Sequence, residues 1–235
     1  MTTNEGALTP STAGSSAELL RTTQGLWGSK GSADTTGFSG QKEVIKFAVP
    51  ASRPYGGWFD EVVDIIIELA EAAGYSESEV IEKVVVEHDQ LVIFIRPEHL
   101  VEVATWCRDD QDLRFEMCLG VTGIHYPNDK GRELHGYFPL FSITHNRMIA
   151  LECTAPDANP HMPSLVPVYP GDDWPEREAF DLMGIIFDGH PALTRSVMPD
   201  DWVGHPQRKD YPLGGIAVEY KGAVIPPPDT RRDYN

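Results

Sequence analysis

The residues best suited to chemistry in this 235-residue chain lie in one polar stretch near its C-terminal end. Between 172 and 184, the sequence Asp-Asp-Trp-Pro-Glu-Arg-Glu-Ala-Phe-Asp-Leu-Met-Gly combines acidic side chains with one arginine. It predicts a helix capped by Asp173 and ended by Gly184. Arg177 and Asp181 can meet on one face of that helix, although an exposed pair contributes only about 0.3–0.5 kcal/mol. An ordinary capped helix with a surface ion pair therefore remains an open interpretation.

Two Gly-His-Pro triplets follow this helix and raise the question of a metal site. Their histidines, His190 and His205, have no second ligand at helical spacing and no Cys-x-x-Cys pair beside them. Each is held in a turn between glycine and proline, so we expect hydrogen bonds to local backbone or to an interface carboxylate. A stand-alone metal-dependent hydrolase that uses both histidines and nearby aspartates is an alternative of another class.

The second triplet leads into the basic pair Arg208-Lys209, followed by Asp210. The proximity of Asp200-Asp201 predicts mutual charge satisfaction, and together with Arg195 the basic residues can also meet an acidic patch on a partner. The chain has no Gly-x-Gly-x-x-Gly, Walker or Gly-x-Ser-x-Gly motif. Their absence favours a structural or assembly role over nucleotide binding or hydrolysis by a serine nucleophile.

Composition excludes several classes of partner. Asp and Glu number 36 against 19 Lys and Arg, which gives a formal net charge of −17. Such a chain is a poor candidate for binding nucleic acid or anionic lipid, because basic side chains supply most of that affinity. We also expect neither a transmembrane helix nor a signal peptide, because no suitable apolar run is present.

The cysteines predict structural thiols rather than a redox centre. Cys107, Cys118 and Cys153 are far apart and form no Cys-x-x-Cys pair. This pattern argues for a reducing compartment, against a disulfide framework, and against an iron–sulfur cluster housed by this chain alone.

The chain divides by composition into three regions. Residues 1–40 form a low-complexity tail, either flexible or docked on a partner, because they hold few large apolar residues. Residues 41–154 have the pattern of an α/β domain. Residues 155–235 are rich in proline, which limits them to short helices and an extended path across their own domain or a partner subunit.

The fold class follows from the order of elements in the middle region. Helical and alternating patterns there predict an α+β fold: a mixed, mainly antiparallel sheet with helices on one face. The proline-rich segment with its short helix follows this sheet. The predicted elements are a helix over 58–73 ended by Gly74, strands over 83–87 and 91–96, a helix over 98–108 after Pro97, and strands over 114–126, 134–144 and 147–154.

Three linked motifs resemble a known family. They are Glu-Arg-Glu-Ala-Phe-Asp-Leu-Met-Gly-Ile from Glu176, Phe-x-Gly-His-Pro-x-Leu from Phe187, and Gly-His-Pro-x-Arg-Lys-Asp-Tyr-Pro-Leu from Gly204. The set is similar to the thirty-kilodalton subunit family of respiratory complex I, which supplies the C subunit of the bacterial NADH-quinone oxidoreductase. The resemblance covers roughly 80–215, and the sequence departs from the family at Thr194, Ser196 and Asp172-Asp173.

The resemblance implies a non-catalytic subunit in the hydrophilic arm, on the cytoplasmic side of the cell membrane. It implies no cofactor in this chain, with FMN and iron–sulfur clusters in partner subunits. Contacts are expected chiefly with the D subunit, which is of the forty-nine-kilodalton type, and also with the B and I subunits. The equivalent subunit of a membrane-bound hydrogenase or F420 dehydrogenase is an alternative. The residues assigned to the motif and subunit interface are Glu176, Arg177, Glu178, Asp181, His190, Arg195, Asp200, Asp201, Trp202, His205, Arg208, Lys209, Asp210 and Tyr211.

Overall fold

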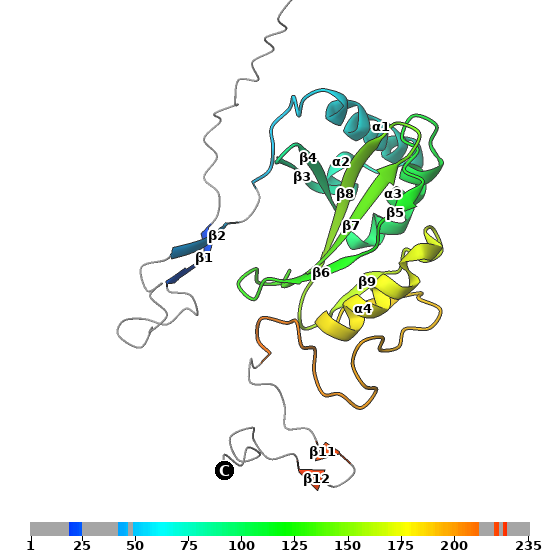
Figure 1. Ribbon diagram of the computed structural model, residues 1–235. Helices are drawn as coiled ribbons and strands as arrows, with labels where there is room; N and C mark the ends of the chain where they lie inside the picture. The colour runs from blue at the N-terminus through cyan, green and yellow to red at the C-terminus, as the bar shows by residue number, and fades with distance from the viewer. Residues whose placement is uncertain (1–18, 25–41, 47–48, 212–218, 221–222, 225–235) are drawn as a thin grey trace, which may run out of the picture. The chain divides into compact units, whose positions relative to one another are not determined.

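The computed structural model describes residues 19–24, 42–46, 49–211, 219–220 and 223–224 (Figure 1). The chain forms two compact units, Met1–Ser52 and Arg53–Asn235. In the first unit, β1 (Leu19–Gln24) pairs antiparallel with β2 (Lys42–Lys46), so a strand lies inside the region predicted as a tail. The rest of that predicted tail lies outside the described residues.

A six-stranded sheet forms the centre of the second unit. Its strand order is β3-β4-β8-β7-β5, and β6 also pairs with β7. Every pairing is antiparallel except the parallel pairing of β4 with β8, so the predicted mixed, mainly antiparallel sheet is confirmed. The strands are β3 (Ile81–Glu87), β4 (Gln90–Ile95), β5 (Met117–Cys118), β6 (Thr122–His125), β7 (Leu134–Ser142) and β8 (Arg147–Ala155).

Helix α1 (Trp58–Ala73) has the predicted bounds. Its buried residues follow the helical period, as Val62, Val63 and Ile66 illustrate. Gly74 ends the helix in the left-handed conformation with φ 92°, and its N–H donates to carbonyls of the last turn. A short helix, α2 (Glu77–Val80), leads from α1 into β3.

The second predicted helix is also present, with a different first turn. Residues Pro97–His99 form the 3-10 turn η2, and α3 (Leu100–Asp109) continues from it. Proline suits this start because its missing N–H would have no partner within the helix. The buried side chains of α3 are Leu100, Val103, Ala104 and Cys107.

The strand predicted over 114–126 is wrong as a single element. The structure divides it into β5 and β6, with Gly120 between them at φ 106°. A Cβ atom at Gly120 would lie 3.0 Å from Cγ of Pro175, so only glycine allows this close approach. The alternating apolar pattern therefore predicted the strand content but missed the bend.

The core lies between the sheet and the helices, on one face of the sheet. Phe138 and Leu140 of β7 and Leu151 of β8 are fully buried with the apolar residues of α1 and α3 in one cluster. Figure 1 shows these helices on one side of the sheet, as predicted. Within the described residues, no helix has the length and apolar character needed to cross a membrane.

The segment after β8 packs on the same core. β9 (His161–Pro163) and β10 (Ile186–Asp188) pair in parallel. Between them in sequence lie the 3-10 turn η3 (Pro170–Asp172) and helix α4 (Asp173–Met183). At Gly123 of β6, a Cβ atom would lie 2.8 Å from Cγ of Met183, so the glycine lets α4 lie close on the sheet. The short pair β11 (Glu219–Tyr220) and β12 (Ala223–Val224) follows near the C-terminal end.

Candidate functional site

Helix α4 positions the first motif, and its N-terminus differs from the prediction. The N-cap position belongs to Asp172 rather than Asp173, and no side chain caps the helix. The preceding turn η3 already gives Asp172 a helical backbone, which turns its carboxyl group into the protein. The predicted end is confirmed, because Gly184 lies at φ 82° and its N–H donates to the carbonyl of Phe180.

Asp181 does not form the predicted surface pair with Arg177. Its side chain is fully buried, and Oδ1 lies 2.5 Å from Nη1 of Arg195. Burial alone would raise the pKa of Asp181, but backbone N–H donors and Arg195 hold that pKa below its usual value. Asp181 therefore anchors the following loop instead of decorating the helix surface. The backbone donors to Oδ2 are Ser196, Val197 and Met198, at 3.1, 2.8 and 2.8 Å.

Arg195 extends this anchor through the rest of the loop. Besides the Asp181 carboxylate, its guanidinium donates to the carbonyls of Trp202 and Gly204, at 2.9 and 3.1 Å. Through Arg195, the backbone of Trp202 and Gly204 is thereby connected to Asp181 near the C-terminal end of α4. The loop 195–204 owes its shape to hydrogen bonds rather than to a ladder of its own.

Arg177 binds the backbone at the start of the same loop. Its Nε and Nη2 donate to the carbonyls of Thr194 and Arg195, each at 3.2 Å. Its guanidinium also lies 4.3 Å from the ring centre of Trp174. Because residues 194 and 196 make these contacts through backbone atoms, their departures from the family pattern leave the hydrogen bonds in place.

Both motif histidines bond to backbone groups, but the predicted local contact is present only at His190, because the partner of His205 lies 24 residues earlier. Nε2 of His190 donates to the carbonyl of Asp173 at 3.1 Å, and Nδ1 accepts the N–H of Ala192 at 3.0 Å. Nδ1 of His205 donates to the carbonyl of Asp181 at 2.9 Å. These contacts fix the turns on α4, and they do not favour the hydrolase alternative.

Arg208 pairs with Asp210 inside the predicted charge cluster, but its second partner is Asp157 rather than Asp200 or Asp201. Its Nη2 lies 2.7 Å from Asp157 and 2.9 Å from Asp210. Asp200 and Asp201 are exposed, and no ion pair of the described residues includes them. Asp157 lies 51 residues earlier than Arg208, and no local spacing in the sequence reveals this partner.

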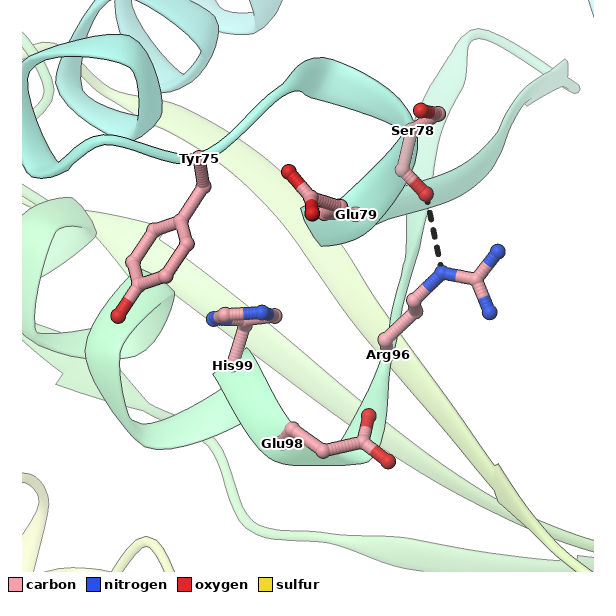
Figure 2. Close-up of a pocket in the computed structure, with 6 residues that line it drawn as sticks. All are labelled: Tyr75, Ser78, Glu79, Arg96, Glu98 and His99. Atoms are coloured by element: carbon pink, nitrogen blue, oxygen red, sulfur yellow. Dashed lines mark hydrogen bonds between the residues drawn. The ribbon is translucent and has the colours of Figure 1, made fainter.

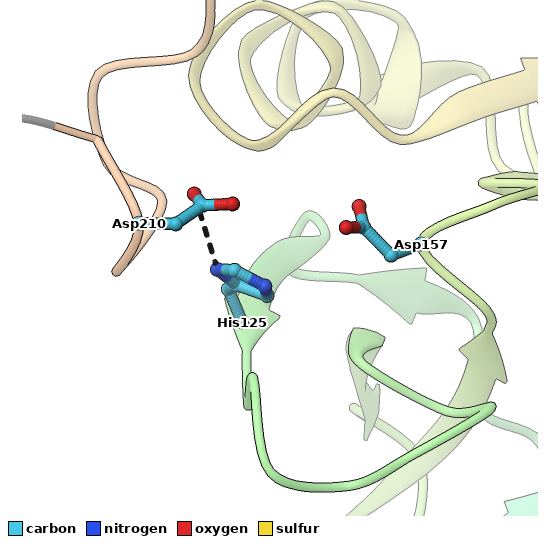
Figure 3. A group of neighbouring side chains, drawn as sticks. All are labelled: His125, Asp157 and Asp210. Carbon is cyan, nitrogen blue, oxygen red and sulfur yellow. Dashed lines mark ion pairs between the residues drawn. The ribbon is translucent and has the colours of Figure 1, made fainter.

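His125 of β6 was also missed by sequence reasoning. This buried imidazole accepts the backbone N–H of Lys209 through Nδ1, at 3.1 Å. Figure 3 shows it facing Asp210, with Asp157 on the neighbouring segment. Burial, followed by the charge of Arg208, lowers the pKa of His125, which keeps the ring neutral and able to accept a hydrogen bond.

The three side chains of Figure 3 have the composition of a metal site, since one ligand atom from each lies within 4.8 Å of the others. The atoms that would bind the metal, however, already have partners within the chain. Arg208 neutralises both carboxylates, and the Lys209 N–H occupies the lone pair of His125 Nδ1. The group is an ion-pair cluster that holds the segment 205–211 on β6.

Some of the remaining motif residues make contacts within the chain, and others are exposed to solvent. Nε1 of Trp202 donates to the hydroxyl of Tyr211 at 3.2 Å, and the Tyr211 ring lies against Gly204. Glu178 and the side chain of Lys209 are exposed. Glu176, predicted in the first turn of the helix, is fully buried, and its Oε1 accepts the N–H of Leu165 at 2.6 Å.

Comparison with known proteins identifies the family. The family described as respiratory-chain NADH dehydrogenase, 30 Kd subunit, matches residues 93–217, which include all the contacts above. This chain belongs to that family.

Two relatives are named as the C subunit of NADH-quinone oxidoreductase. The protein from Streptomyces coelicolor is 57% identical over 96% of this chain and 90% of its own. The protein from Mycolicibacterium gilvum is 57% identical over 97% of this chain and 100% of its own. These names do not favour the hydrogenase or hydrolase alternatives. Among solved structures, a trypsin-resistant fragment of Nqo5 covers 56% of this chain and 99% of its own, at 20% identity and a TM-score of 0.46.

The cysteines of this respiratory-chain family member are free thiols, as predicted. Cys107 and Cys153 are buried, and Cys118 is partly buried. Burial raises the pKa of all three, that of Cys107 to about 12. Thiols of this kind stay protonated at neutral pH and are poor nucleophiles.

A cleft of about 410 Å³ opens beside α2 and η2, apart from the motif residues. Figure 2 shows Arg96 donating from Nε to the carbonyl of Ser78, while Glu79 and Glu98 line the same space. Charges of both signs at an open surface favour neither an anion nor a cation. The cleft is also lined by Tyr75 and His99.

Proposed function

We propose that this chain is the C subunit of a proton-translocating NADH-quinone oxidoreductase and that it serves as a non-redox scaffold. Its partners are chiefly the D subunit, together with the B and I subunits, on the cytoplasmic side of the cell membrane. FMN and iron–sulfur clusters belong to partner subunits. The family match and the protonated, separate thiols support this assignment.

The scaffold proposal rests on the pairing of the charged motif residues within the chain. Asp181, Arg195 and Arg208 are paired within the chain, so these ion pairs shape the motif surface. The motif segment also has exposed apolar side chains: Trp174 is 63% exposed, Val197 59% and Val203 72%. Exposed apolar groups rimmed by polar residues are typical of protein–protein contacts, and tryptophan is prominent among interface anchors.

Arg177 gives Trp174 a fixed support. Its guanidinium stacks on the indole and is itself hydrogen-bonded to two loop carbonyls. A side chain held in one orientation loses less conformational entropy on docking. We therefore assign Trp174 as the main contact with the D subunit.

Affinity purification of the tagged full chain from its native membrane tests the proposal. The wild-type chain should recover the D, B and I subunits together with NADH-quinone reductase activity. Trp174→Ala should reduce recovery of the D subunit at least tenfold, since anchor truncation costs about 2 kcal/mol or more. Ile143→Ala is the matched control, because Ile143 is 61% exposed in the β7–β8 turn, outside the motif.

Two results would contradict the proposal. One is purification of the wild-type chain without oxidoreductase subunits. The other is full recovery of the D subunit by Trp174→Ala, which would remove Trp174 as the anchor. Recovery of hydrogenase subunits in place of NADH-oxidising subunits would favour the related enzymes.

A further inference from the structure

Two carboxyl groups are buried side by side where η3 meets α4. Asp172 and Glu176 are four residues apart, and both side chains have 0% exposure. Three of their four carboxyl oxygens have no hydrogen-bond partner, namely both oxygens of Asp172 and Oε2 of Glu176. Buried oxygens without donors are rare in folded proteins, so the pair requires an explanation.

The surroundings offer these carboxyl groups few donors. Glu176 accepts the N–H of Leu165 through Oε1, and Ser164 and the N–H of Val166 also face it. Asp172 faces the thiol of Cys118 on β5, and Tyr169 lies close enough to interact with its charge.

No positive charge compensates the pair within the part of the chain that the structure describes. None of the salt bridges there reaches Asp172 or Glu176, and the groups that act most strongly on Glu176 include no basic side chain. Two ionised carboxylates in this position would repel each other and lose their hydration. The geometry thus disfavours the doubly charged state.

We propose that Asp172 and Glu176 form a proton-binding pair that holds one proton in the folded chain near neutral pH. The proton supplies an O–H donor to carboxyl oxygens that otherwise have no hydrogen-bond partner, and it removes one of the two negative charges. When the pair ionises, the O–H bond breaks, the proton passes to water, and both carboxylates remain charged. The ligand of this site is therefore the proton itself.

The electrostatics of the pair support this assignment. Burial, with the neighbouring charge of Asp172, raises the pKa of Glu176 to about 7. Burial also raises the pKa of Asp172. A pair that titrates near neutrality exchanges its proton within the ordinary range of pH, as coupled carboxyl groups do.

Ionisation of the pair should destabilise the packing at the start of α4. Pro175 lies between the two carboxyl groups in sequence and packs on Gly120, while Glu176 holds the Leu165 backbone. Because the folded-state pKa is raised, stabilisation by the pair is fully present below the unfolded pKa of about 4.3 and is lost as pH rises through about 7.

Infrared spectroscopy of the full chain tests the proposal directly. At pH 6 the wild-type chain should show the carbonyl-stretch band of a protonated carboxylic acid, which disappears as pH rises to 8. Glu176→Gln or Asp172→Asn should remove or shift this band. Glu178→Gln is the matched control, because Glu178 is exposed on the same helix, and it should leave the band unchanged.

A second measurement uses the unfolding equilibrium. Between pH 5 and pH 8, the wild-type unfolding constant should rise by roughly 50- to 100-fold relative to that of Glu176→Gln. A wild-type chain with no protonated carboxyl band at pH 6 would overturn the proposal. So would a band that survives in both single variants. A band that only Asp172→Asn removes still places the proton on the pair.

Discussion

At the scale of single residues, Asp181 does the most to define the motif. It lies inside α4, yet its partners are Arg195 and three consecutive backbone N–H groups of the next loop. Helical spacing suggested Arg177 as the partner because spacing describes only neighbours on one helix. Arg195 lies 14 residues away in irregular chain, and no sequence period reports such a contact.

We predict that Asp181→Asn lowers the free energy of unfolding by about 3 kcal/mol. The variant leaves Arg195 partly buried without its counter-charge, and removal of one member of a buried pair costs about 3–5 kcal/mol. Urea denaturation at pH 7 measures the change. Glu178→Gln, an exposed acid of the same helix, should stay within about 0.5 kcal/mol of the wild type. A loss below about 1 kcal/mol for Asp181→Asn would show that the loop does not depend on this carboxylate.

At the scale of elements, the sequence predicted what local patterns determine. Helix α1 has its predicted bounds because a buried stripe and a terminal glycine define it. The hairpin between β3 and β4 was found from its two apolar runs, and His88 and Asp89 adopt the positive φ angles of a two-residue turn. The bend at Gly120 was missed although a glycine inside a strand pattern can mark one, whereas its close approach to Pro175, 55 residues further along the chain, required the fold.

The segment 205–211 shows the same limit at the site. Its turn histidine bonds to the backbone of Asp181 rather than to the predicted local backbone, and the attachment of the segment to β6 depends on His125, which lies 84 residues before Lys209. The charged residues of the motif could be selected from the sequence, whereas their partners required the fold. Long-range pairs of this kind are set by how the segment returns to the sheet.

The His125 contact predicts a loss of stability in acid. Its pKa is lowered by burial and by Arg208, so its stabilising contribution is present above the unfolded pKa of about 6.5. That contribution is lost as pH falls, because a protonated Nδ1 cannot accept the N–H of Lys209. Hydrogen exchange should show a smaller protection factor for the Lys209 amide at pH 5 than at pH 7.

His125→Asn separates this effect from other titrations. Its amide oxygen can take the place of Nδ1 as acceptor without changing charge, so protection of the Lys209 amide should vary less with pH. The stabilising contribution of His125 is lost as pH falls, whereas that of the Asp172–Glu176 pair is lost as pH rises. Equal protection of Lys209 in the wild type at both pH values would contradict the role assigned to His125.

At the scale of the whole molecule, the core and the motif surface have separate supports. One apolar cluster joins the sheet to its helices, whereas the loop 195–204 is held to α4 by hydrogen bonds to the Asp181 carboxylate. A change in those hydrogen bonds can therefore alter the surface that we propose for docking while the sheet stays folded. Although the net charge is −17, two basic residues of the motif, Arg195 and Arg208, form ion pairs within the chain that shape that surface.

Arg177→Ala tests this separation. It removes two donors to loop carbonyls and the support beneath Trp174, so recovery of the D subunit from native membranes should fall several-fold. The free energy of unfolding should fall by only about 1–2 kcal/mol, because these are hydrogen bonds at a partly exposed site. Arg147→Ala is the matched control, since Arg147 stacks on Trp58 at 5.0 Å outside the motif. It should leave recovery of the D subunit unchanged, whereas full assembly of Arg177→Ala would show that docking does not require the supported tryptophan.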